Sequence, residues 1–487
     1  MIRRDGPKSV EQELGCDPND VNMGVLTPIT TFIKFFGSFV VAVSAATFII
    51  VLVAAMNARA DRTIVVGSIE QGLESGRSAF PSVWKMNLVT GIDTYTDCLV
   101  LNISTFEDQK IEQTLSRSEF IDDPLRHPCD ILKDEISGLF AENNVVDDYW
   151  RYWWGSSMLL NIVVGYNGLS VAGYQNLLLY LSYASIGLAL LSALYHYRRA
   201  ALPLVPVALG LVFGFGLPIF GQSIAHAPGL IFGMLALAGY PILRGQTRGS
   251  SWNFGFFAFV GCVTFYLELL NGNLVVILLC SMLIRLLGAR TARTSRPSWP
   301  GWAADWPTAA AVLSVAVAMT AGAVSMVVLR IGLRVALTQQ TLSEAVSNWA
   351  SRMGKWNSGN SQTIDGSWLE TVLTLYYHIG DGAFPLLSRD GVVITYGLCA
   401  LLYAAVFFAL IRSVRSAGPG ARDMMFATVL IVAVIPAWYS VFLAHTIHHP
   451  WMMMRLLAPF FALAPAILLL APWRQSLRAS PTTYPIT

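Results

Sequence analysis

The sequence contains few charged residues. Asp, Glu, Lys and Arg make up 13% of its 487 residues, whereas soluble domains average about a quarter. This scarcity excludes an ordinary water-exposed domain, and the lack of a basic domain or an arginine stripe beside aromatics excludes a nucleic-acid-binding surface. Hydrophobic residues reach 54% and the mean hydropathy is +0.54. The chain is therefore predicted to be a polytopic membrane protein in a lipid bilayer.

Cysteine and lysine are also scarce. The six cysteines lie at positions 16, 98, 129, 262, 280 and 399, and no spacing among them resembles a metal site. Few lysines, many arginines and abundant alanine are typical of a GC-rich bacterial genome. The first 30 residues mix both charge signs before any apolar run begins, which argues against a cleavable signal peptide.

Ten apolar runs predict an all-α membrane protein of about ten transmembrane helices, because about 20 apolar residues cross a bilayer. The expected order is a tail 1–30, the first helix 31–56, an outer loop with interfacial helices 57–174, helices 2–7 in 175–334, an outer loop 335–390, helices 8–10 in 391–472 and a tail 473–487. Arginines cluster after every second run, and the alternate short connections carry no lysine or arginine. By the positive-inside rule, both termini are expected in the cytoplasm and both long loops outside.

Carboxylates form the first candidate site, in the first outer loop. Asp93 and Asp97 are four residues apart and would share one face of a helix. Beside an apolar wall, such a pair suits proton abstraction from an alcohol, because desolvation raises the pKa of the base. A solvated pair or a helix N-cap is the alternative. Glu268 ends an apolar run, where a carboxylate is costly unless it faces a cavity or partner; a simple helix-end carboxylate is its alternative.

An aromatic cluster follows in the same loop. Arg151 stands among aromatic residues and could bind a lipid phosphate, while Trp153 and Trp154 could stack on a sugar. The commoner use of such a cluster is as an anchor at the membrane interface.

Histidines gather near the C-terminal end of the chain. His445, His448 and His449 lie within five residues, beside Trp451 and Arg455. Histidine and arginine here are predicted to neutralise a leaving phosphate: Arg455 contacts it with the help of His448, and His445 is a further phosphate-binding candidate. A divalent metal on His445 and His449 is the alternative, although no carboxylate partner lies nearby. The sequence otherwise gives no reason to expect a cofactor.

A disulfide is the other prediction for the first outer loop. Cys98 and Cys129 are the only two cysteines on the oxidising side in this topology. They are predicted to form a bond across the loop, with two free thiols as the alternative.

Three short motifs together resemble a group of bacterial multi-spanning glycosyltransferases of the GT-C architecture. They are Asp93/Thr96/Asp97, Arg151-Tyr-Trp-Trp-Gly155, and Trp438-Tyr439 with His445, His448, Trp451 and Arg455. Members of that group often carry histidine where this chain has Trp154, and aspartate where it has Glu268.

The resemblance implies a sugar donor linked to polyprenyl phosphate and an acceptor that is a glycan, lipid or protein. It implies an acidic general base in the first outer loop, with inversion at the sugar carbon. The competing interpretation is a transporter or a flippase for lipid-linked sugars. It is favoured by residues 210–221, which resemble the broken helices of transporters.

Overall fold

The computed structural model describes most of the helical part of the chain. The described residues are 23–74, 94–105, 111–116, 119–122, 126, 128–138, 145–148, 155–214, 217–244, 250–268, 272–291, 306–347, 404, 407–408, 411, 419–441 and 456–470. Two four-residue strands are present, and the other regular elements of these residues are helices. The expectation of an all-α membrane fold is therefore confirmed at this level.

Five helices are long and apolar enough to cross a membrane, counted over the described residues. They are α1 (Met23–Asn57), α7 (Val171–Tyr197), α10 (Ala227–Arg244), α11 (Ser250–Leu267) and α14 (Pro307–Leu337). Large apolar side chains remain exposed on the outside of the bundle, for example Phe48 at 69% and Leu191 at 63%. Lipid explains both observations, because a helix satisfies its own backbone groups and lipid covers an apolar surface. The chain has the architecture of a multi-pass membrane protein.

Other elements occupy the remaining predicted runs. They are η2 (Arg198–Ala201), α8 (Leu204–Leu209), η3 (Gly210–Gly214), α9 (Leu217–Phe220), α12 (Asn273–Thr291), α18 (Pro419–Val441) and α21 (Leu457–Leu470). The run expected to begin near residue 391 lies largely outside the described residues. Helix α1 begins eight residues before the predicted boundary, because hydropathy marks only the apolar part of a helix.

Helices α11 and α14 pack with their backbones in close contact. A Cβ atom added to Gly261 would lie 2.2 Å from the carbonyl oxygen of Met319, and one added to Gly322 would lie 2.1 Å from that of Ala258. Two glycines thus let the helix backbones touch, as small residues do in membrane helix pairs.

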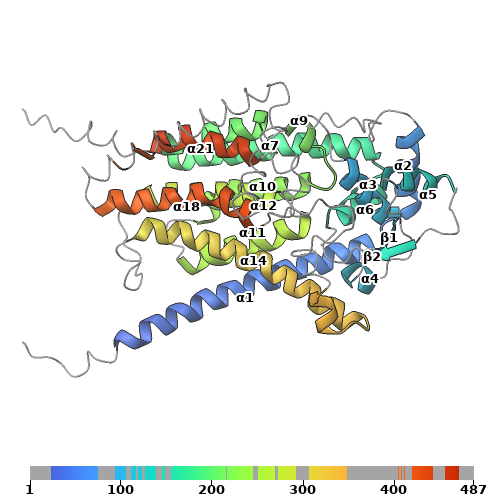
Figure 1. Ribbon diagram of the computed structural model, residues 1–487, viewed down its shortest axis with the longest axis horizontal. Helices are drawn as coiled ribbons and strands as arrows, with labels where there is room; N and C mark the ends of the chain where they lie inside the picture. The colour runs from blue at the N-terminus through green and yellow to red at the C-terminus, as the bar shows by residue number, and fades with distance from the viewer. Residues whose placement is uncertain are drawn as a thin grey trace, which may run out of the picture.

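The segment between α1 and α7 folds into a unit at one end of the bundle (Figure 1), which we call the head unit (residues 58–167). It contains α2 (Arg62–Glu74), α3 (Thr94–Thr105), α4 (Ile111–Ser116), β1 (Glu119–Asp122), α5 (Pro128–Ile136), β2 (Val145–Asp148) and α6 (Gly155–Asn167). The strands β1 and β2 pair in antiparallel orientation. The long loop of the sequence prediction is therefore a folded unit.

Polar side chains join the head unit to the end of α1. Arg62 donates to the carbonyl oxygen of Ser104 at 2.9 Å and to Asn57 Oδ1 at 3.2 Å. Asn161 on α6 donates to the same Asn57 oxygen at 2.9 Å. Burial lowers the pKa of Arg62 to about 10, so the guanidinium stays charged at neutral pH.

Arginines gather at the end of the bundle that lies away from the head unit. Helices α7, α10 and α12 all begin near the head unit, where the backbone N–H of Val171 donates to Ser68 on α2 at 2.8 Å. Their far ends carry the arginines 198, 199, 244, 285 and 290. We call this the arginine end of the bundle. It is the end at which a positive-inside topology requires arginine.

Candidate functional site

Asp97 is buried where the head unit meets the bundle. It lies in the first turn of α3 and is 1% exposed. Its Oδ1 accepts from the Ser223 hydroxyl at 2.8 Å and from the backbone N–H of Ala225 at 2.9 Å. Both donors belong to the turn between α9 and α10. A carboxylate near the N-terminus of its own helix is also favoured by the helix dipole. The Asp97 side chain is therefore held in place and connects two parts of the fold.

His226 continues this turn toward α12. It is fully buried, and its ring stacks on Phe220 with centroids 4.8 Å apart and planes inclined by 7°. Its carbonyl oxygen accepts from Asn273 Nδ2 at 2.8 Å. The histidine therefore lies between the turn that binds Asp97 and the first residue of α12.

Glu268 caps the N-terminus of α12. Its Oε1 accepts from the backbone N–H of Asn273 at 2.6 Å, and its Oε2 accepts from that of Leu274 at 2.7 Å. The side chain is 3% exposed. A carboxylate that satisfies two otherwise unbonded N–H groups at the positive end of a helix is strongly stabilised. This geometry fits the helix-end alternative for Glu268 better than a freely reacting base.

The first turn of α10 packs directly on Glu268. A Cβ atom added to Gly229 would lie 3.2 Å from the Cβ of Glu268. Asp97 and Glu268, predicted as separate candidates, are thus brought to opposite sides of one buried polar region. We call it the polar junction, formed by Asp97, Ser223, His226, Glu268 and Asn273.

Two residues of the polar junction's surroundings were missed by sequence reasoning. Tyr174, in the first turn of α7, is 2% exposed and interacts electrostatically with Asp97. Gln175 beside it is also buried. The only sequence signal was a tyrosine and an amide at the start of an apolar run, a pattern that is common at membrane interfaces.

The disulfide prediction is confirmed. Cys98 and Cys129 are bonded with an S–S distance of 2.01 Å and link α3 to α5. Cys98 is adjacent to Asp97 in the sequence, so the bond restrains the helix that carries the buried carboxylate.

No protein-family model matches the chain, and comparisons with curated proteins and with solved structures give no significant match. The function must therefore be argued from the residues themselves.

Several predicted site residues lie outside the described residues: Asp93, Arg151, Trp153, Trp154, His445, His448, His449, Trp451 and Arg455. Their neighbours in the sequence are informative. Asp93 immediately precedes α3. Gly155, the last residue of the arginine–tryptophan motif, begins α6, and a Cβ atom there would lie 2.7 Å from the ring of Tyr266. The motif therefore ends where α6 contacts Tyr266 of α11, and Tyr266 lies two residues before Glu268 in the sequence.

Arginines also lie at the head-unit end of α14. Arg330 is 2% exposed and donates through Nη1 to the carbonyl oxygen of Leu115 on α4. Arg334 donates through Nε to Gln340 Oε1 at 3.1 Å. Both residues are exceptions to the positive-inside pattern expected from the sequence. Their contacts explain the exceptions, because one arginine holds the head unit and the other orders the chain after α14.

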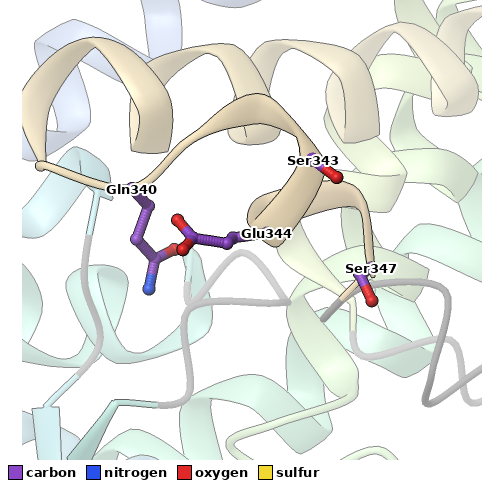
Figure 2. Close-up of a pocket in the computed structure, with 4 residues that line it drawn as sticks. All are labelled: Gln340, Ser343, Glu344 and Ser347. Carbon is purple, nitrogen blue, oxygen red and sulfur yellow. The ribbon is translucent and has the colours of Figure 1, made fainter.

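An open cavity of about 480 Å³ follows α14 (Figure 2). Among the described residues, its lining consists of Gln340, Ser343, Glu344 and Ser347. The Thr341 backbone N–H donates to Glu344 Oε2 at 2.8 Å, and the Glu344 N–H donates to Thr341 Oγ1 at 3.3 Å. This is a capping box. The polar cavity begins the second predicted outer loop and is separate from the polar junction.

Proposed function

We propose that the protein is a membrane glycosyltransferase of the GT-C architecture. It would move a sugar from a polyprenyl-phosphate donor to a hydroxyl of a glycan, lipid or protein acceptor. The observation that carries the proposal is the polar junction, where a buried carboxylate one turn into α3 lies between a disulfide-linked head unit and a lipid-embedded bundle. A lipid-linked donor reaches such a boundary from the bilayer, and a polar acceptor reaches it from water.

The proposed topology has about ten membrane crossings with both termini in the cytoplasm. The arginine end of the bundle then faces the cytoplasm, and the head unit lies on the outer face of a bacterial plasma membrane. The disulfide between Cys98 and Cys129 supports this orientation, because such bonds persist in oxidising compartments.

In the proposed reaction, a carboxylate accepts the proton of the acceptor hydroxyl as that oxygen attacks the anomeric carbon of the sugar. The bond between this carbon and the phosphate oxygen breaks, and polyprenyl phosphate leaves. One displacement inverts the anomeric configuration. Arg151, Arg455, His445 and His448 are proposed to balance the negative charge of the phosphate, and Trp153, Trp154 and Trp451 to contact the sugar.

The contacts of the two aspartates favour different roles within this proposal. Oδ1 of Asp97 is already held by Ser223 and Ala225, which suits a positioning residue. Asp93 immediately precedes the same helix in the sequence and is the proposed base. Glu268 is the reserve base, although both of its oxygens are engaged by α12.

The test is sugar transfer by purified Asp93→Asn, Asp97→Asn and Glu268→Gln variants in liposomes, with a synthetic polyprenyl-phosphate sugar and chromatographic detection of the product. Loss of a general base typically costs about 10²–10⁴-fold, and this loss is expected for Asp93→Asn. The exposed Glu70 on α2 provides a control, and Glu70→Gln should keep the full rate. Wild-type rates in both aspartate variants would rule out an aspartate base, and a loss confined to Glu268→Gln would assign the base to Glu268.

A transporter or lipid flippase is the second candidate, and one observation favours it. Between α7 and α10 the chain forms an α-helix, a π-helical turn and a further short helix, α8, η3 and α9, instead of one continuous span. Interrupted helices of this kind line substrate sites in transporters. The same liposomes distinguish the two functions, because a flippase moves the labelled lipid across the bilayer without forming a glycosidic bond.

A further inference from the structure

Two arginines and two tyrosines meet at the arginine end of the bundle, far from the polar junction. Tyr197 ends α7, Tyr240 and Arg244 lie in the last turns of α10, and Arg285 lies on α12. We call these four residues the arginine–tyrosine cluster. Helix α10 has 18 residues, so at 1.5 Å per residue the cluster lies about 25 Å from the polar junction.

Gly288 shows how closely the side chains converge. A Cβ atom added to this glycine would lie 2.3 Å from Arg244 Nη1 and 3.4 Å from the Tyr197 hydroxyl. Gly288 is three residues after Arg285 on α12, so the two share one helix face. The guanidinium of Arg244 therefore occupies the space beside the α12 backbone on the same face that carries Arg285.

The positive charge of this cluster is not balanced by a carboxylate in the described part of the chain. Arg285 is 7% exposed, and its Nε and Nη1 are buried without a hydrogen-bond partner there. The Tyr197 hydroxyl is also buried; its oxygen lies beside Arg244, with which it interacts, and its O–H has no acceptor among the described residues. The buried carboxylate of Asp423, at this end of the bundle, is committed to capping α14 through the N–H groups of Thr308 and Ala309 at 2.9 and 2.8 Å.

Tyr240 orders the cluster. Its hydroxyl donates to Asn253 Oδ1 at 2.8 Å, so its proton is already used. Its oxygen faces Arg285, with which it interacts electrostatically. Tyr240 thus holds Arg285 in place, while Nε and Nη1 of Arg285 and the hydroxyl of Tyr197 can still donate hydrogen bonds to a bound ligand.

We propose that the arginine–tyrosine cluster binds a phosphate group. Buried donors and charges without partners are costly, and an anion with several acceptor oxygens would satisfy them together. Phosphate fits this set because guanidinium groups bind its oxygens through charge-assisted hydrogen bonds. The cluster lies where helices of membrane-spanning length end, a level at which basic pockets between helices bind phospholipid headgroups. A soluble phosphate compound would use the same chemistry, and the experiment separates the two sources.

The experiment uses the purified full chain in detergent. Native mass spectrometry measures retention of phosphatidylglycerol against phosphatidylcholine, and thermal unfolding is compared in inorganic phosphate and in chloride at equal ionic strength. The wild type should retain phosphatidylglycerol preferentially. Stabilisation by inorganic phosphate as well would identify the phosphate group itself as the ligand, whereas retention of the lipid alone would identify the headgroup.

Variants test the residues. Arg285→Gln should weaken phosphatidylglycerol binding at least tenfold, which corresponds to about 1.4 kcal/mol. Tyr197→Phe removes one hydroxyl without changing charge and should weaken binding about threefold; it decides the matter if Arg285→Gln does not fold. Arg199→Gln removes an exposed arginine from the same end of the bundle and is the matched control. Two results would overturn the proposal. One is a wild type that neither retains phosphatidylglycerol over phosphatidylcholine nor is stabilised by phosphate over chloride, and the other is equal phosphatidylglycerol binding by the Arg199 and Arg285 variants.

Discussion

Replacing Glu135 with glutamine should stabilise the head unit at neutral and alkaline pH. The Thr105 hydroxyl lies 2.6 Å from Glu135 Oε1 and 2.6 Å from the carbonyl oxygen of Asn102. One hydroxyl proton cannot serve both acceptors, so the geometry suits a protonated Glu135 that donates to Thr105. Glu135 Oε2 is buried without a hydrogen-bond partner in the described part of the chain. Burial accordingly raises the pKa of Glu135 from 4.5 to about 7.

The sign and size of the effect follow from that pKa. The pKa of Glu135 is higher in the folded state than in the unfolded state. Glu135 therefore does not lower the free energy of unfolding below its unfolded pKa of 4.5, but it does so increasingly as the pH rises through its folded pKa of about 7. Each pKa unit corresponds to about 1.4 kcal/mol, so ionised Glu135 costs the head unit about 3 kcal/mol at pH 8. Glutamine carries no charge and keeps a donor for Thr105, so Glu135→Gln should recover most of this.

Hydrogen–deuterium exchange of the amides in α3 and α5 measures the local free energy of opening, after correction for the intrinsic pH dependence of exchange. Glu135→Gln should raise it by about 3 kcal/mol at pH 8 and by less than about 1 kcal/mol at pH 5. Glu70→Gln, on the exposed face of α2, should change neither value. The reasoning fails if the wild type and Glu135→Gln show the same pH dependence.

Three further predictions concern folding. Replacing Cys98 and Cys129 by serine should cost about 3–4 kcal/mol, because the bond closes a chain segment with a separation of 31 residues; pulse proteolysis of the head unit measures this, and reduced wild type should behave alike. Asp423→Ala removes the cap of α14 and should lower the free energy of unfolding by about 1–2 kcal/mol, which is measured as a lower midpoint of thermal unfolding. Gly322→Ala should destabilise the α11–α14 contact by about 1–3 kcal/mol in the same assay. Gly332→Ala, on the same helix with open space around it, should have little effect, and equal losses in the two variants would refute the contact argument.

Features governed by hydropathy and topology could be predicted from the sequence. Lipid imposes a helix on an apolar run of sufficient length, which is why the sequence predicts membrane spans where the structure has α1, α7, α10, α11 and α14. The Cys98–Cys129 pair followed from topology alone, since it needed only the side of the membrane on which each cysteine lies.

The hydrogen-bond partners of Asp97 could not be predicted from the sequence. Its partners Ser223 and Ala225 are 126 and 128 residues away, and one of them contributes only a backbone N–H, which any residue other than proline has. Glu268 shows a similar limit. Gly272 has a φ of +100°, so the chain turns back and the carboxylate reaches the N-terminus of α12. Neither hydropathy nor charge distinguishes such a cap from a reactive carboxylate.

The hydrogen bonds of Asp97 also set the order in which the head unit and the bundle assemble. The aspartate is synthesised 126 residues before Ser223, which at about 5–20 residues per second is a delay on the order of 6–25 s. The disulfide needs only Cys98 and Cys129, so it can form during this interval. In the proposed topology, the head unit crosses the membrane with Asp97 still hydrated, and it docks only after the turn before α10 has been synthesised. The polar junction therefore closes late in assembly, after the disulfide can already have formed.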